Sequence, residues 1–423
     1  MQGAWRHCFL THIGFTKVSE SQHFPRSDRS RSSQGLRIAL SLALAPAVAV
    51  GLARFAYALL LPPMRANLHW SFATAGVINT ANTLGYLLGA VGTSMVIRRY
   101  GTRRAFVASL GITVIALLAT GSTGNIDVLV ILRTVAGASG AVTFISGAGL
   151  VAAATSAISP YRATSLLGIY YAGGGAAIVA SGLVIPYLLA ATSPADDWRW
   201  GWVLLGGLGV VAFAIATPVA LAQAEPPVPP RPDRHWPVRR FVPVLVSYGL
   251  FGAGYIAYMT FIVAFLENHG TGPGGITVFW VVLGMASVVG AFAWARLISR
   301  LNGGRGLAMV LAVLAVGAIL PLISHSPVAT IGSALLFGGS FLSVVTAVTV
   351  IVRHSLQLHH WTAAIAGLTI AFAVGQSIGP VLAGVLSDGP TGLSVGLSLS
   401  VGMILAGLAV ALTQRHYQPC TGL

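Results

Sequence analysis

Charged side chains are scarce in this chain. Only 8% of its 423 residues are charged, whereas 55% are hydrophobic. Soluble globular proteins carry about 25% charged residues, so this chain could not cover its own surface in water. The composition therefore excludes a soluble enzyme, a secreted disulfide scaffold and a disordered chain. The two cysteines, Cys8 and Cys420, lie in the terminal segments and offer neither a disulfide framework nor a metal-binding spacing, and we expect no metal and no cofactor.

Acidic residues are the rarest charged group. The chain has nine Asp and Glu against 24 Lys and Arg, which leaves a net charge of +15. Such an excess can indicate nucleic-acid binding. Here the positive residues lie in short loops between apolar runs rather than on one soluble face, and we expect no nucleic-acid partner.

Long apolar runs fill most of the sequence. They have the length that a helix needs to cross a hydrocarbon core of about 30 Å, and they are rich in glycine, which allows close helix packing in lipid. A transmembrane β-barrel is excluded because its strands would be about 10 residues long and alternate in polarity. We predict an all-α membrane protein with twelve spans. They cover residues 38–61, 72–97, 105–120, 128–154, 165–191, 200–222, 243–266, 276–298, 307–323, 328–352, 362–386 and 393–413.

The loops predict the orientation in the membrane. Nearly all Lys and Arg residues outside the spans fall on one side, and the opposite side holds only Arg65 and Arg199. Positive loops face the cytoplasm, so both termini are predicted to be cytoplasmic and the number of spans to be even. The first apolar run is long and leads directly into further spans, which favours an uncleaved spanning helix over a signal peptide.

A proline-rich stretch divides the chain. Residues 223–242 contain six prolines and predict a cytoplasmic linker, because proline interrupts helices and stiffens linkers. It separates two six-helix bundles at 38–222 and 243–413, flanked by a disordered cytoplasmic tail at 1–37 and a C-terminal tail at 414–423. Two such halves are typical of secondary transporters with a site between them near the bilayer midplane.

Several motifs resemble the major facilitator superfamily over residues 38–413. The matching positions in the predicted fourth span are Leu129, Arg133, Gly137, Ser139, Gly140 and Ala141. In the eleventh span they are Gly375, Gly379, Pro380 and Gly384, and at the start of the sixth they are Asp197, Trp198, Arg199 and Trp202. The stretches 51–64 and 168–173 are similar to the YbfB/YjiJ branch. The resemblance implies the major facilitator fold and a bacterial inner-membrane transporter.

The loop between the second and third spans departs from the family pattern. Arg99, Gly101 and Arg103 match it, but Ser94 replaces its first glycine and Arg98 replaces an aspartate. In the family this aspartate is thought to hold the cytoplasmic side closed. The loop is predicted to form the inner gate, and its charge partner is left open. Topology determination alone explains the arginines equally well.

Two arginines lie within predicted spans, where no Asp, Glu or His is deep. Arg54 and Arg133 are expected at similar depths in the outer half of the membrane. Ionisable groups in this position are expensive and favour a functional role. As a pair they would bind a carboxylate or phosphate through bidentate hydrogen bonds. The alternative is structural, with each guanidinium satisfying backbone carbonyls or extending toward the membrane surface.

Polar and aromatic residues on the spans that line the family's cavity are further candidates, although such side chains also fill packing space. They are Tyr57, Asn79, Asn82, Tyr86, Tyr170, Tyr171, Tyr255, Tyr258, Thr260 and Gln376.

The sequence thus predicts a monomeric transporter that moves a small solute across the cytoplasmic membrane by alternating access, in secondary active or facilitative mode. An organic anion fits the two arginines. The alternative is proton-driven efflux of drugs or metabolites, with a coupling proton carried at the outer rim by Glu267, Asp388 or Asp127. Apart from the solute and the lipid bilayer we expect no partner. A membrane enzyme and a receptor are disfavoured, because the chain has no acidic cluster and no sizeable soluble domain.

Overall fold

The computed structural model describes residues 26–156, 158–191, 197–227, 236–357, 360–390 and 392–415. Within these ranges the chain is almost entirely helical and contains no strand, which confirms the predicted all-α class.

The first predicted span consists of four consecutive helical segments, and five single helices complete the first half. The segments are α1 (Arg26–Leu42), α2 (Leu44–Pro46), the π-helix η1 (Ala47–Phe55) and α3 (Tyr57–Asn67). The helices are α4 (Phe72–Tyr100), α5 (Thr102–Thr120), α6 (Ile126–Ala154), α7 (Pro160–Ala191) and α8 (Asp197–Ala222).

The second half begins with a short 3₁₀ turn, η2 (Val238–Phe241). Its helices are α9 (Val242–Asn268), α10 (Pro273–Ile298), α11 (Arg305–Ile323), α12 (Pro327–Phe341), α13 (Ser343–Ser355), α14 (Trp361–Ser387) and α15 (Leu393–Leu412). Helices α12 and α13 together form the predicted tenth span.

Local sequence signals account for several helix ends. Ser71 accepts a hydrogen bond from the Thr74 N–H at the start of α4, and Ser326 caps α12 in the same way. Such side chains satisfy N–H groups that have no partner within the helix. Helix α4 ends at Gly101, whose φ of +82° lies in the left-handed region that glycine adopts most easily.

Eleven helices of the described chain are long and apolar enough to cross a membrane, and the protein is a multi-pass membrane protein. Helix α4 is not among the eleven although it has 29 residues. It carries Asn79, Thr80, Asn82 and Thr83 within little more than one turn, and these side chains lower its hydropathy. Its place in the bundle is that of the predicted second span.

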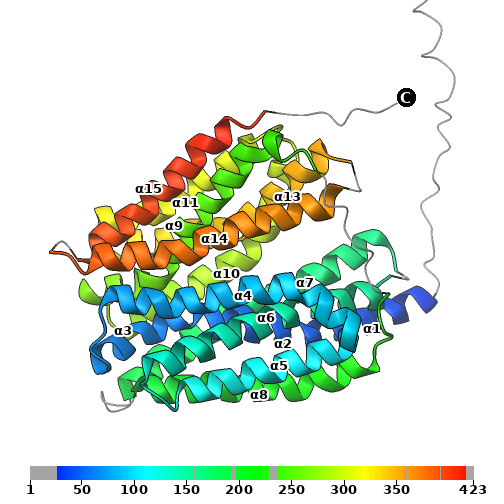
Figure 1. Cartoon of the computed structure of the whole chain (residues 1–423), viewed down its shortest axis with the longest axis horizontal. Helices are drawn as coiled ribbons and strands as arrows, with labels where there is room; N and C mark the ends of the chain where they lie inside the picture. Colours follow the sequence, from blue (N-terminus) through cyan, green and yellow to red (C-terminus); the bar gives the residue numbers. More distant parts are fainter. Residues whose placement is uncertain are drawn as a thin grey trace, which may run out of the picture.

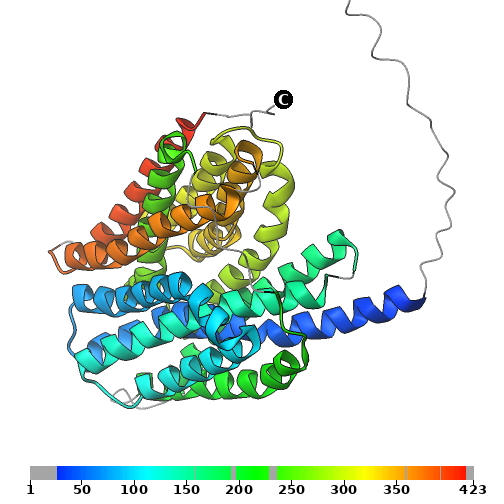
Figure 2. The same ribbon diagram turned by 45° about the vertical axis from the view of Figure 1, so that its right-hand side comes forward.

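The helices form two bundles, α1–α8 and α9–α15, which lie side by side (Figures 1 and 2). The bundles meet where α4 packs on α14, α7 on α10 and α3 on α9. In both views they diverge toward the end where α1 begins. We call this the predicted cytoplasmic end, and the other end, which carries Asp388, the predicted outer end.

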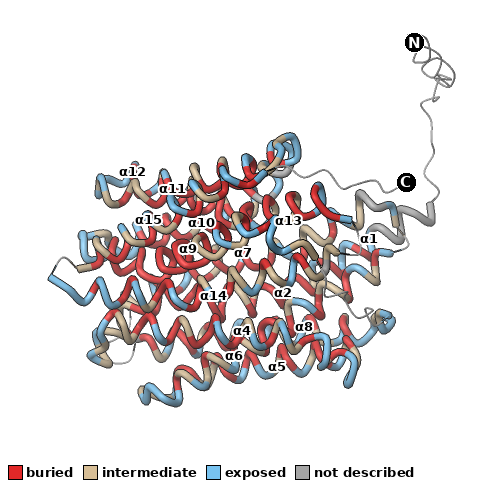
Figure 3. Tube along the Cα trace, turned by 45° about the horizontal axis from the view of Figure 1, so that its top comes forward, coloured by how far each residue is buried: buried red, intermediate tan, exposed pale blue. Residues whose placement is uncertain are grey.

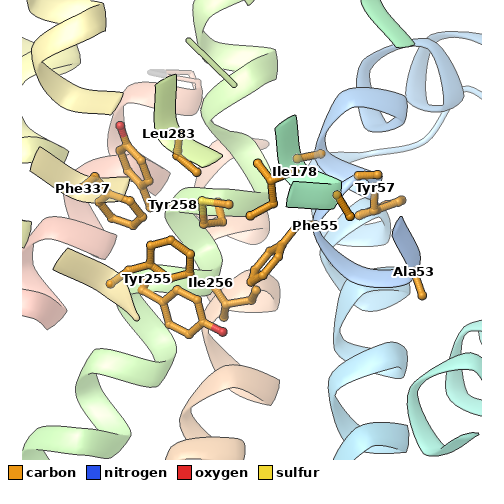
Figure 4. Packing of buried hydrophobic residues seen from close by; sticks show 14 of the residues in the cluster. Ala53, Phe55, Tyr57, Ile178, Tyr255, Ile256, Tyr258, Leu283 and Phe337 are labelled. Atoms are coloured by element: carbon orange, nitrogen blue, oxygen red, sulfur yellow. The ribbon is translucent and has the colours of Figure 1, made fainter. Parts of the chain in front are cut away.

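Buried residues follow the surfaces where helices face one another, whereas helix ends and outward faces are exposed (Figure 3). Helix α9 is the most central span, with 89% of its apolar window buried, against 33% for α8. Figure 4 shows how the bundles meet at the centre, where Phe55 of η1 points toward Ile256 and Tyr255 of α9. The Phe55 ring also packs edge-on against Phe341, with 5.8 Å between the ring centres.

Helix α1 begins at Arg26, within the segment 1–37 that was predicted as a disordered tail. The first span therefore extends beyond the apolar run as a continuous helix, because helical hydrogen bonding does not stop at the edge of the apolar sequence. Residues 1–25, the linker residues 228–235 and residues 416–423 lie outside the described ranges, so the predictions for them remain predictions.

Candidate functional site between the two halves

An irregular stretch of the first span positions Arg54. Residues Ala47–Phe55 form a π-helix directly after Pro46, and the Ala56 N–H donates to the Gly51 carbonyl at 3.0 Å. This i→i+5 pattern is rare in proteins and occurs often at functional sites. Gly51 packs against α7 so closely that a Cβ would collide with Ala177. The close contact and the altered helical register together determine which face Arg54 occupies.

Arg54 lines a small cavity between the two halves. The walls come from the first span, α4 and α9. The lining residues are Arg54, Phe55, Tyr57, Ala58, Asn79, Ile256, Met259 and Thr260. The cavity volume is about 10 Å³, roughly the space of one water molecule. Because both halves contribute walls, a larger solute enters only when the halves separate.

Three buried polar atoms of the residues that line this cavity make no hydrogen bond within the described residues. They are Nε and Nη2 of Arg54 and Oδ1 of Asn79, and both residues are buried. Two hydroxyl groups of the wall have partners, since the Tyr57 hydroxyl donates to the Ala75 carbonyl and the Thr260 hydroxyl to the Ile256 carbonyl. Buried groups without partners are costly and uncommon, so these atoms are candidate ligand contacts.

Arg133 lies in the first half, beside the cavity rather than on its wall. Its side chain is fully buried, and none of its three guanidinium nitrogens has a hydrogen-bond partner in the part of the chain that is described. The guanidinium carbon lies 5.4 Å from the ring centre of Tyr57 and 4.9 Å from that of Trp202. These cation–π contacts partly offset its desolvation. Tyr57, which lines the cavity, is thus also the neighbour of Arg133.

Helices α4 and α6 are packed closely around Arg133. The Asn82 side chain donates from Nδ2 to the Arg133 carbonyl at 3.2 Å. Gly137 faces the α4 backbone at Asn82 and Tyr86, where a Cβ would collide. Gly137, one turn after Arg133, therefore has a role in packing. It lets α4 approach α6 closely enough for the hydrogen bond between Asn82 and the Arg133 carbonyl.

Tyr86 connects the Arg54 region to an aromatic cluster. Its ring centre lies 5.5 Å from the Arg54 guanidinium carbon, and its ring also packs against Phe144. Phe144 in turn contacts Tyr170 and Tyr171. Tyr171 is 42% exposed, which places it at the edge of this cluster and away from the cavity wall.

The second half contributes a different set of aromatic residues. Tyr255 accepts a hydrogen bond from Nε2 of Gln376, and its ring stacks at 6.0 Å on Phe341, the partner of Phe55. Tyr258 points away from Tyr255 (Figure 4); its hydroxyl is hydrogen-bonded to Ser333 at 2.6 Å inside the second bundle. Tyr255 and Gln376 therefore form one pair near the interface, and Tyr258 is a core residue of its own half.

The structure also places residues at the cavity that the sequence did not single out. Phe55, Ala58, Ile256 and Met259 supply most of its apolar wall. Two of these residues could have been predicted from helical spacing, since Ala58 follows Arg54 by four residues and Ile256 precedes Thr260 by four. Such positions share one helix face.

The family described as "Uncharacterised MFS-type transporter YbfB" matches residues 46–412. The chain belongs to this family. As an MFS transporter it acts on a small-molecule substrate, and no catalytic family is indicated. A search of curated proteins finds no match to this chain.

Crystal structures of other transporters resemble this YbfB-type chain in fold. One is a mutant of the nucleoside transporter NupG, with a TM-score of 0.70 and 12% identity, covering 89% of this chain and 99% of that one. Another is a bacterial homologue of the human lysosomal transporter Spinster, inward-facing and unoccupied, with a TM-score of 0.67 and 14% identity. It covers 92% of this chain and 97% of that one. At such low identity the likeness is one of fold.

The predicted outer end of this YbfB-type transporter is closed by a contact between its halves. The Asp388 carboxylate, at the end of α14, accepts hydrogen bonds from the Phe72 N–H at 2.6 Å and the Ala73 N–H at 3.0 Å, at the start of α4. A carboxylate in this position satisfies unpaired N–H groups and complements the helix dipole. Gly384 lies one turn before Asp388, and a Cβ there would collide with the Phe72 backbone.

The loop that was predicted to form the inner gate has an acidic partner in the linker. Glu225 accepts hydrogen bonds from the Thr102 and Arg103 N–H groups at the start of α5, and its Oε2 lies 3.1 Å from the Arg103 Nε. Partial burial raises the pKa of Glu225, but these hydrogen bonds outweigh it and hold the pKa below its ordinary value. Arg98 donates instead to Ser94 and Arg99 to Tyr100.

A second cavity lies between the halves near the predicted outer end. It has a volume of about 250 Å³. Its walls are Leu59, Pro186, Leu189, Ala190, Glu267, Thr271, Pro273 and Ile276. Glu267 is the acidic residue of an otherwise mostly apolar wall. Within the described residues, no group of His, Cys, Asp and Glu is arranged to hold a metal ion.

Proposed function

We propose that this YbfB-type transporter moves an organic anion through the cavity at Arg54 by alternating access. The observation that carries the proposal is that Arg54 lines a cavity built from both halves while its Nε and Nη2 donors have no hydrogen-bond partner within the described residues. An anion placed there receives charge-assisted hydrogen bonds, which are stronger than neutral ones. Its binding would remove the cost of the unpaired buried donors.

The charges around the cavity support an anion over a cation. The wall holds Arg54 and no acidic residue. Arg133 adds a second positive charge next to Tyr57. In the low dielectric of the bilayer interior, its electrostatic attraction for an anion in the cavity is stronger than it would be in water. Arg54 is then the direct anion ligand, whereas Arg133 contributes attraction from behind Tyr57.

The protein would work as a monomer in the bacterial cytoplasmic membrane with both termini in the cytoplasm. The distribution of Lys and Arg over the loops supports this orientation. The conformation with the halves in contact around Asp388 is then closed to the outside.

A second candidate function is proton-driven efflux of drugs or metabolites. Glu267 supports it, because this carboxyl group lines the 250 Å³ cavity among apolar side chains near the predicted outer end. A carboxyl group in such surroundings can bind and release a coupling proton. Transport driven by an inward proton gradient and abolished in Glu267→Gln would favour this candidate.

The anion proposal is tested by thermal unfolding of the purified protein in detergent with lactate, malate, citrate and benzoate. A ligand at about 100 times its Kd stabilises by about 2.7 kcal/mol. Arg54→Ala is expected to weaken anion binding about 10- to 100-fold, which corresponds to the loss of hydrogen bonds to a charged group. Arg37→Ala is the matched control, because Arg37 lies in the same span but is exposed. Equal affinities in the wild type and Arg54→Ala would refute the proposal.

A further inference from the structure

Asn79 lines the same cavity as Arg54 and carries a buried hydrogen-bond acceptor. The orientation of its amide follows from Thr260, in the opposite half. The Thr260 hydroxyl has a single proton, which it donates to the Ile256 carbonyl at 2.6 Å. It therefore accepts from Asn79, whose Nδ2 lies 2.5 Å away. The Oδ1 atom is left without a hydrogen bond within the described residues, although Asn79 is only 2% exposed.

The cavity thus offers two kinds of unsatisfied group. Arg54 supplies donors with a positive charge, and Asn79 supplies a neutral acceptor. A simple anion satisfies Arg54 and leaves the Asn79 Oδ1 unpaired. A ligand satisfies both residues when it carries a hydrogen-bond donor close to its anionic group. Sites with a buried polar group of this kind discriminate strongly against ligands that lack the complementary group.

The charges around Asn79 distinguish between the two common donors, a hydroxyl and an ammonium group. An ammonium group would be desolvated beside Arg54, in a wall without any carboxylate, and near the second positive charge of Arg133. Burying a charge without an opposite partner is costly. A hydroxyl group is neutral and avoids this cost.

We infer that the solute is a hydroxylated organic anion whose carboxylate binds Arg54 and whose hydroxyl donates to the Asn79 Oδ1. The inference rests on the proposed function and narrows its substrate class. Asn79 is then a specificity-determining residue. Thr260 orients the Asn79 amide from the other half and is therefore a positioning residue.

The test compares anion pairs that differ by one hydroxyl group. Dissociation constants of the full-length protein in detergent are measured for lactate against propionate and for malate against succinate. The hydroxylated member of each pair is expected to bind at least about fivefold more tightly. In Asn79→Leu, which keeps the branching at Cγ and removes the acceptor, the members of each pair are expected to bind equally. Thr83→Val is the matched control, because this α4 hydroxyl only donates to the Thr80 carbonyl, at 2.9 Å.

Each outcome separates this inference from the proposed function. If the wild type binds the anions without a preference for the hydroxyl group, the inference is overturned while the anion proposal stands. If it binds neither these four anions nor citrate and benzoate, both fail. A preference that persists in Asn79→Leu would assign the hydroxyl contact to another residue and overturn the inference.

Two further measurements keep the test decisive if Asn79→Leu does not fold. Thr260→Val removes the group that orients the Asn79 amide and is expected to reduce the hydroxyl preference; an unchanged preference contradicts the inference. Alanine is compared with lactate in the wild type. Tighter binding of alanine than of lactate would show that the site prefers an ammonium group to a hydroxyl group, which also contradicts the inference.

Discussion

Replacing Asp388 by alanine removes the hydrogen bonds that join the end of α14 to the start of α4. Two N–H groups, of Phe72 and Ala73, lose their acceptor, and the helix loses a negative charge at its N-terminus. Loss of such a cap costs about 0.5–2 kcal/mol. Asp388 is exposed, so we expect about 1 kcal/mol, in the lower half of this range. Because the contact joins the two halves, this energy is lost only from the conformation in which they meet.

The consequence is a change in the population of the conformation that is open at the predicted outer end. An energy of about 1 kcal/mol corresponds to a factor of about five in the equilibrium constant. The assay is alkylation of Ser377→Cys by a water-soluble maleimide, in a background where Cys8 and Cys420 are replaced by serine. Ser377 is buried beside Thr80, which donates to the Ser377 carbonyl across the α4–α14 contact.

The alkylation rate follows the open population when opening and closing are faster than the chemical step. It is therefore expected to rise about fivefold in Asp388→Ala and less in Asp388→Asn, which keeps one acceptor. Asp127→Ala is the control, because Asp127 lies at the same predicted end but is not part of this contact between the halves. An unchanged rate in Asp388→Ala would refute the idea that this carboxylate holds the outer end closed.

Two further predictions concern Arg133, within a membrane span, and Glu225, in the linker. Arg133→Leu removes a buried guanidinium whose nitrogens have no hydrogen-bond partner within the described residues, so its thermal midpoint in detergent is expected to equal or exceed that of the wild type. Anion affinity should fall about fivefold through loss of Coulomb attraction, and a large drop in the midpoint with unchanged affinity would identify a purely structural role. Glu225→Ala is expected to cost at most about 1 kcal/mol at pH 7, because the Arg103–Glu225 pair is 40% exposed. The lowered pKa of Glu225 means that its contribution is present above about pH 4.5, its ordinary value, and is lost as the pH falls through the folded-state pKa. The difference in midpoint between the wild type and Glu225→Ala should therefore vanish in acid, and a difference that stays constant from pH 7 to pH 3 would contradict this account.

The spans were predictable from the sequence because the property that defines them is local. An apolar run of membrane-crossing length must become a helix in lipid, where each backbone polar group needs an internal partner. Arg54 and Arg133 could be singled out for the same reason, since a charge within such a run stands out without any structure. The starts of α4 and α12 were also encoded locally, in Ser71 and Ser326.

The division of roles between the two arginines was decided by the tertiary structure. Both are buried arginines of the first half, yet Arg54 lines the cavity and Arg133 lies behind Tyr57. The π-helix that positions Arg54 depends on packing against α7, and no periodicity in the sequence indicates it. The predicted inner-gate loop gives a second example, because the acidic partner of Arg103 is Glu225, which is distant in sequence and lies in the linker.

The free acceptor on Asn79 has the same origin. Composition and spacing show that α4 carries polar residues, but they do not show which of their atoms have partners. That depends on Thr260 in the other half and on the direction in which its single proton is donated. The sequence alone thus determined the membrane spans and the candidate charges, because hydrophobicity and charge act along the chain. Only the tertiary structure decided which buried polar atoms remain without a partner, because hydrogen bonds between distant segments exist only once the chain has folded.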